Sequence, residues 1–238
     1  MTPGPGVAAA GIVLAGGRST RMGRAKADLP WGDGTLLAAV VAALAPVVAP
    51  VIVVRAPGQA LPPLPAGTRV AEDRAAGRGP LEGIHAGMAA AAGVPRVVVA
   101  ATDLPFLGPA LVARLLDALG DADAAVPVVS GRPQPLLAAY RTDLLPEVAR
   151  LLDAGERRVG ALLAGRRVTW LDEAALLADP AVRAADPGLA GLADIDTPGD
   201  LRAAQSKRET GTSSPDATPV PSSGSHASTR APASEVIA

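Results

Sequence analysis

The sequence of 238 residues contains no cysteine. Disulfide bonds, zinc–thiolate sites, iron–sulfur clusters and cysteine nucleophiles are therefore all excluded. Only two histidines are present, which disfavours a histidine metal cage and most serine–histidine chemistry. A bound metal ion would have to rely on carboxylate oxygens, the ligands preferred by Mg²⁺ and similar hard cations.

The chain also lacks an excess of positive charge, since its formal net charge is −1. Nucleic acids bind to basic surfaces, so we expect no nucleic-acid partner. The amino-terminal segment lacks the positively charged region of a secretory signal, and we therefore expect a cytoplasmic protein.

Long hydrophobic runs are scarce, and the one that imitates a membrane span is interrupted. Residues 36–54 carry no charge, and a membrane helix needs ~20 such residues. Pro46 and Pro50 break the run, and residues 51–54 are β-branched, which is typical of a central strand. We therefore expect a helix, a turn and a strand here, and no contact with a membrane.

Strand-like and helix-like segments alternate along most of the chain. Apolar runs predict strands at 11–15, 50–55, 68–71, 96–101, 124–130, 135–141 and 167–171. Helical patterns fall at 36–45, 81–92, 109–119, 143–153 and 158–164. This alternation predicts an α/β fold with a mainly parallel sheet covered by helices. The short gap between the strands at 124–130 and 135–141 favours one local antiparallel pair.

The last 34 residues differ in composition, because 16 of them are Ser, Thr or Pro. Such a segment has little apolar surface with which to offset its ordering entropy. We therefore predict a folded domain over residues 1–204 and a disordered tail over residues 205–238.

A glycine-rich basic segment follows the first predicted strand. Gly16 and Gly17 allow backbone N–H groups to approach an anion, and four cations follow within nine residues: Arg18, Arg21, Arg24 and Lys26. This pattern suits a triphosphate. It is neither a Walker A loop nor a Gly-x-Gly-x-x-Gly dinucleotide turn. A solvated basic loop without a ligand is the alternative interpretation.

Asp103 follows the most apolar strand, residues 96–101, and is the first candidate for a metal ligand. Ligands of open α/β sheets bind outside the carboxyl ends of the strands, which is where this carboxylate is expected. Asp196 is the second candidate. Each can also be interpreted as a helix cap or turn residue, because Pro105 and Pro198 follow them closely.

The run Leu-Ala-Gly-Gly-x-Ser-x-Arg-Met-Gly-x-x-Lys at 14–26 resembles the nucleotidyltransferase superfamily that activates sugars and cofactors. Within it, the chain resembles MobA-type molybdenum cofactor guanylyltransferases, of the MobA-like NTP transferase family. Further segments agree in order and spacing: Glu72-Asp73, Gly79-Pro80-Leu81-Glu82-Gly83, Asp103-Leu104-Pro105-Phe106, residues 154–159 and Asp194-Ile195-Asp196-Thr197-Pro198. The resemblance covers about residues 11–202 and implies a Rossmann-like three-layer αβα fold with a mostly parallel mixed sheet.

The resemblance also implies roles for individual residues. Catalysis would involve Arg21, Lys26 and Asp103, and Asp103 and Asp196 would hold Mg²⁺. The nucleotide would bind to Leu14, Ala15, Gly16, Gly17, Lys26, Asp73, Gly79, Pro80, Leu81 and Asp103. The chain departs from the family at Arg55, which stands where members carry an asparagine that contacts the nucleoside.

The implied reaction is Mg²⁺-dependent transfer of GMP from GTP to the terminal phosphate of molybdenum cofactor, with release of pyrophosphate. Molybdoenzymes or cofactor-delivery proteins would be further partners. Two alternatives stay open. One is a cytidylyltransferase or another sugar- or cofactor-phosphate nucleotidyltransferase, because the segment at 194–198 is closer to the cytidylyltransferase pattern. The other is a nucleotide-binding module without transfer activity.

Overall fold

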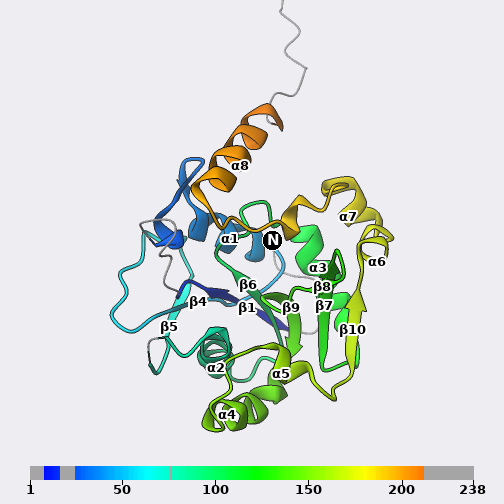
Figure 1. The fold of residues 1–238 in the computed structure, drawn as a ribbon. Helices are drawn as coiled ribbons and strands as arrows, with labels where there is room; N and C mark the ends of the chain where they lie inside the picture. Colours follow the sequence, from blue (N-terminus) through cyan, green and yellow to red (C-terminus); the bar gives the residue numbers. More distant parts are fainter. Residues whose placement is uncertain (1–7, 17–24, 76, 212–238) are drawn as a thin grey trace, which may run out of the picture.

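A computed structural model describes residues 8–16, 25–75 and 77–211. Its centre is an eight-stranded sheet (Figure 1), in which seven strands follow the spatial order β10-β7-β9-β6-β1-β4-β5. Their bounds are β1 Ala9–Leu14, β4 Val51–Arg55, β5 Arg69–Glu72, β6 Arg96–Ala101, β7 Ala124–Val129, β9 Leu137–Arg141 and β10 Val168–Leu171.

All neighbouring pairs along this path are parallel except those of β9, which is antiparallel to both β6 and β7. The predicted antiparallel pair of β7 and β9 is therefore confirmed. The eighth strand, β8 (Arg132–Pro133), pairs with the end of β7. A separate two-stranded sheet joins β2 (Pro30–Trp31) and β3 (Gly34–Thr35).

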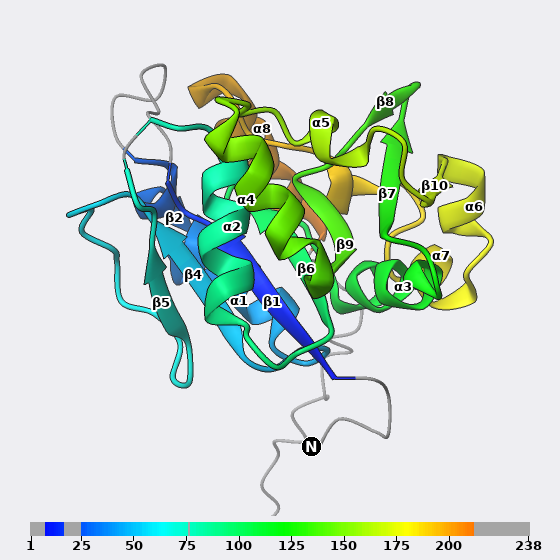
Figure 2. The ribbon, with the colours of Figure 1, turned by 90° about the horizontal axis from the view of Figure 1, so that it is seen from below.

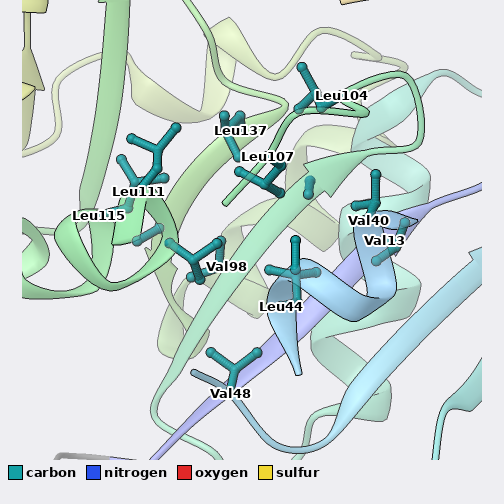
Figure 3. Close-up of a cluster of buried hydrophobic side chains, with 14 of the residues drawn as sticks. Val13, Val40, Leu44, Val48, Val98, Leu104, Leu107, Leu111, Leu115 and Leu137 are labelled. Carbon is teal, nitrogen blue, oxygen red and sulfur yellow. The ribbon is translucent and has the colours of Figure 1, made fainter. Parts of the chain in front are cut away.

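Helices cover both faces of the sheet (Figures 1 and 2). On one face lie α1 (Leu36–Leu44), α3 (Pro109–Leu119) and α6 (Glu173–Leu177), and their buried side chains share a core with Val13, Val53 and Val98. Figure 3 shows part of this core, with Val13 and Val98 of the sheet near Leu44 of α1. On the other face lie α2 (Pro80–Ala90), α4 (Leu145–Asp153) and α5 (Gly160–Leu163), which pack on Ile12, Ile52 and Val97. The alternation of adjacent strand residues between two cores confirms the predicted α/β fold with a mostly parallel mixed sheet.

The uncharged run at 36–54 forms α1, a turn and β4, as predicted. In the described part of the chain, no helix has the length and apolar character needed to cross a membrane.

The carboxyl-terminal region contains helices that the patterns did not predict. These are α6, α7 (Pro180–Ala185) and the extension of α8 (Pro198–Gly211). Residues 205–211 were predicted to be disordered, and that prediction is wrong because they continue α8. Contacts with aromatic side chains distant in sequence stabilise this last part of the helix. The remaining tail, residues 212–238, lies outside the described residues.

Candidate functional site

A cleft of about 710 Å³ opens at the edge of the sheet where β1, β4 and β6 end. It lies where an open α/β sheet is expected to bind its ligand, outside the carboxyl ends of the strands. Its lining includes most of the predicted site and several further residues: Leu14, Ala15, Gly16, Ala25, Lys26, Val54, Ala56, Gln59, Asp73, Gly77, Gly79, Pro80, Gly83, Ala101, Thr102, Asp103 and Leu136.

The backbone that leaves β1 is held in place on both sides. The Thr102 hydroxyl donates to the Leu14 carbonyl at 2.7 Å, and the Gln59 amide donates to the Ala15 carbonyl at 3.0 Å. The next residue, Gly16, lies close to the Asp73 carboxylate, since a Cβ there would be in van der Waals contact with it at 3.4 Å. Gly17 and Arg21, two further predicted site residues, lie outside the described residues.

Lys26 begins a 3₁₀ helix, η1 (Lys26–Asp28), and its ammonium lies between two carboxylates. Its Nζ donates to Asp103 Oδ2 and to Asp196 Oδ1, each at 2.7 Å. The side chains of Lys26 and Asp103 are 22% and 20% exposed, whereas that of Asp196 is 54% exposed. Burial lowers the pKa of Lys26, but the hydrogen bonds to Asp103 and Asp196 outweigh it and leave the pKa raised. We call these three residues the charged triad.

Backbone contacts place the two acids of the charged triad side by side. Asp103 follows β6, and its carbonyl accepts a 2.9 Å hydrogen bond from the Ile195 N–H. Asp196 itself does not cap α8, because the Thr197 hydroxyl accepts from the Asp200 N–H. The Asp200 carboxylate in turn accepts from the N–H groups of Asp196 and Thr197. This reciprocal cap leaves the Asp196 side chain directed to Lys26.

Asp73 lies on the β5 side of the cleft. Its N–H donates to the Arg55 carbonyl at 2.9 Å, whereas its buried Oδ1 has no hydrogen-bond partner within the described ranges. Its pKa is raised from 3.8 to about 6, mainly by burial and further by the nearby charges of Glu82 and Glu72. A buried carboxylate oxygen without a partner is costly, and a ligand that donates hydrogen bonds would relieve this cost.

The segment that begins α2 contributes backbone rather than side chains. Gly79 has φ +82°, a conformation that favours glycine, and a Cβ there would come within 3.0 Å of the Arg157 carbonyl. Gly79 and Pro80 line the cleft at the amino-terminal end of α2, which favours negative charge. The Leu81 side chain is fully buried in the core and does not line the cleft.

Two groups near the cleft were not predicted from the sequence. Gln59 and Thr102 carry no pattern that signals chemistry, because their role is to bond to the backbone of Leu14 and Ala15. Arg55, the departure from the family, forms an ion pair with Glu72 at 3.0 Å and donates to the Gln59 carbonyl. Its side chain thus braces the loop that carries Gln59.

The two acids of the charged triad have the chemistry of ligands for a divalent cation. Two carboxylate oxygens already converge on one positive charge, the Lys26 ammonium. No cluster of three or more acidic or histidine side chains suitable for a metal occurs in the described ranges. Mg²⁺ commonly binds one or two carboxylates and completes its shell with water and substrate phosphates. Asp103 and Asp196 therefore fit this ion.

A family model and two curated relatives point to the same protein family. The model of the MobA-like NTP transferase domain matches residues 11–169. A Mycobacterium tuberculosis protein named "probable molybdenum cofactor guanylyltransferase" is 45% identical over 159 residues, covering 65% of this chain and 78% of that protein. A Mycobacterium avium protein of the same name is 39% identical over 199 residues, covering 82% and 93%.

Solved structures agree on the fold. The molybdopterin-guanine dinucleotide biosynthesis protein A of Archaeoglobus fulgidus superposes with a TM-score of 0.67 at 24% identity, covering 84% of this chain and 99% of that one. The family model spans more than half of the chain, and both curated relatives exceed the identity at which a shared family is expected. The chain therefore belongs to the MobA-like NTP transferase family and is a nucleotidyltransferase.

Proposed function

We propose that this chain transfers GMP from GTP to the terminal phosphate of molybdenum cofactor and releases pyrophosphate. The observation that carries the proposal is the charged triad at the carboxyl edge of the sheet, where Lys26 lies 2.7 Å from Asp103 and from Asp196. The names of the curated relatives support the choice of GTP and of the molybdenum cofactor.

The proposed reaction needs charge neutralisation and alignment more than proton transfer. The attacking phosphate has a second pKa of about 6, so it is anionic near neutral pH and needs no general base. This agrees with a cleft whose lining contains no histidine among the described residues. The chain's task is then to hold two anionic substrates in line.

In the proposal, several residues hold the two substrates in line. The backbone at Leu14, Ala15 and Gly16 borders the nucleotide, and the start of α2 at Gly79 and Pro80 faces its negative charge. The Asp73 carboxyl accepts or donates hydrogen bonds at the nucleoside. The Lys26 ammonium donates to phosphate oxygens and stabilises the charge that moves to pyrophosphate.

Asp103 and Asp196 would hold Mg²⁺, which supplies Lewis-acid neutralisation of the phosphates when it is bound. The Lys26 ammonium has three N–H donors, of which two bond to Asp103 and Asp196, so the third can donate to a phosphate oxygen. Molybdoenzymes or cofactor-delivery proteins would receive the product, and the reaction would take place in the cytoplasm, where GTP is abundant.

The test is pyrophosphate release, measured with each of the four NTPs and with and without molybdenum cofactor. The expected result is release with GTP that depends on both the cofactor and Mg²⁺. Asp103→Asn should lower the rate by about a hundredfold, as the loss of one preorganised catalytic group typically does. The matched control is Asp117→Asn, on the exposed side of α3, which should leave the rate unchanged.

Cytidylyl transfer is the second candidate, and one observation favours it. The segment at 194–198 resembles cytidylyltransferases, and its Asp196 does reach Lys26. Direct competition of GTP and CTP for transfer to the same cofactor separates the two. Preferential use of CTP would overturn the guanylyl proposal, and nucleotide binding without pyrophosphate release would replace both with a binding module.

A further inference from the structure

The carboxyl-terminal helix α8 packs on an apolar cluster next to the charged triad. This aromatic cluster consists of Leu29, Trp31, Leu36, Ala39, Phe106, Ile195, Leu201 and Ala204. At its centre, the rings of Trp31 and Phe106 meet edge to face with their centroids 5.1 Å apart. The cluster thus joins three segments that are far apart in the sequence.

Each member of the charged triad is a few residues away from the aromatic cluster along the chain. Lys26 precedes Leu29 and Trp31, Asp103 precedes Phe106, and Asp196 follows Ile195 directly. The Ile195 N–H also donates to the Asp103 carbonyl at 2.9 Å. A shift of the cluster would therefore move both carboxylates and the lysine relative to each other.

One face of α8 holds this cluster together. Leu201, Ala204, Gln205 and Arg208 follow the i, i+3, i+4, i+7 spacing of a single helix face. Leu201 and Ala204 pack into the cluster, and the Gln205 amide donates to the Pro30 carbonyl at 3.2 Å. The Arg208 guanidinium lies over the Trp31 ring, with its Cζ 5.7 Å from the centroid.

A second cation completes the contact. Lys207 Nζ lies 5.5 Å from the centroid of the Phe106 ring. Two adjacent cations of α8 thus cover the two rings of the cluster, one each. At its other end, α8 fixes the Asp196 backbone through the Asp200 carboxylate. Both ends of the helix therefore act on loops of the charged triad.

We infer that α8 is a clamp that positions the charged triad, with Lys207 and Arg208 as positioning residues that act through Phe106 and Trp31. Neither cation is among the described residues that line the cleft. The inference rests on the proposed function, since it gives α8 a role in aligning the groups that would act on the nucleotide. It also explains why the helix extends past residue 204, into a segment with almost no apolar residues.

The test uses the full chain with the double substitution Lys207→Met and Arg208→Met. Methionine keeps aliphatic contact and removes the charge, so the fold is retained. We expect the dissociation constant for Mn²⁺ alone, titrated by electron paramagnetic resonance, to rise about tenfold as the two carboxylates lose alignment. Exchange of the Ile195 amide hydrogen should accelerate by a similar factor, while KM for GTP changes less than about twofold and kcat falls.

Two further variants act as controls. Arg202→Met removes an equivalent cation from an exposed position of α8 and should change none of these quantities. Lys207→Arg with Arg208→Lys keeps both charges over the rings and should restore Mn²⁺ affinity.

Unchanged Mn²⁺ affinity and Ile195 exchange in the double variant would overturn the clamp, as would equal changes in Arg202→Met. Should the wild type release no pyrophosphate, the proposed function fails, but the exchange of the Ile195 amide still decides whether α8 positions this segment.

Discussion

At the scale of single residues, Lys26 is the central group because it separates two like charges. Asp103 and Asp196 each accept a 2.7 Å hydrogen bond from the same ammonium. Without that cation, two carboxylates at this separation would repel each other. In the proposed function a divalent cation would bind the same two acids, so the lysine and the ion would compete for them.

This competition predicts that removal of the lysine lowers kcat but raises the affinity for a divalent cation. Lys26→Met should lower kcat by about a hundredfold or more, because a preorganised cation is lost from the transferred phosphates. The same substitution should tighten binding of Mn²⁺ alone, measured by electron paramagnetic resonance without nucleotide. Asp103→Asn, by contrast, should weaken Mn²⁺ binding. A Lys26→Met protein with weakened Mn²⁺ binding would contradict the competition.

The raised pKa of Asp73 predicts that the stability of the protein depends on pH. Its native pKa of about 6 exceeds the unfolded value of 3.8, so between these values the native state binds more protons than the unfolded chain. Its contribution to stability is therefore present at low pH and is lost as the pH rises through about 6.

Asp73→Asn should remove this loss and raise the free energy of unfolding at pH 7 by about 1 kcal/mol, after allowance for solvent screening in the cleft. Urea midpoints at pH 4, 5, 6 and 7 measure the effect, and the gain should vanish near pH 4. The substitution should also weaken GTP binding. Asp117→Asn is the control, and a gain that does not depend on pH would refute the explanation.

At the scale of elements, α2 lies unusually close to β1. A Cβ at Gly87 would come within 2.5 Å of Ile12, and a Cβ at Gly83 within 2.9 Å of Leu14. These two glycines, one turn apart, allow the helix to approach the strand. The close approach keeps Gly79 and Pro80 at the same cleft as Leu14 and Gly16.

Gly87→Ala should therefore destabilise the protein by about 1–3 kcal/mol, the usual cost of overpacking a filled core. Chemical denaturation followed by circular dichroism measures this cost. Gly160→Ala, at the start of α5, is the matched control, because a Cβ there would meet nothing within 4 Å. Equal stability of the two variants would show that Ile12 moves aside without cost.

Most elements were predicted well from the sequence. Seven of the eight strands of the main sheet and the helices α1 to α5 agree with their predicted positions within a few residues, although α5 has only four residues. The helices α6 and α7, of five and six residues, gave no recognisable helical period and were not predicted. The extension of α8 was missed because it is held by Lys207 and Arg208 on rings that are distant in sequence.

Some residues of the candidate site were predicted from the sequence and others were not. Lys26, Asp73 and Asp103 line the cleft as expected, since charged residues after apolar strands leave a visible pattern. Gln59 and Thr102 were not predicted because neutral side chains that bond to a backbone carbonyl resemble ordinary loop residues. The buried Leu81 side chain shows that a motif position can serve the core rather than the ligand.

At the scale of the whole molecule, the prediction concerns where the chain can be shortened. Deletion of residues 205–238 removes Gln205, Lys207 and Arg208 and should lower the melting temperature by several degrees, about what a loss of 1 kcal/mol produces. Deletion of residues 212–238 alone should leave it unchanged, since that composition has little apolar surface to bury. Thermal denaturation of both proteins checks this, and equal melting temperatures would show that the end of α8 contributes nothing.

The reversed strand β9 has a consequence for how this architecture can be altered. It begins, rather than ends, at the cleft, and Leu136 just before it lines one wall. The opposite wall is built from the ends of β1, β4 and β5, on the far side of β6. The hairpin of β7, β8 and β9 can therefore be lengthened or exchanged without disturbing the loops that follow those three strands. A graft in this hairpin would therefore alter the wall of the cleft at Leu136 and keep the wall that Gly16 and Asp73 line.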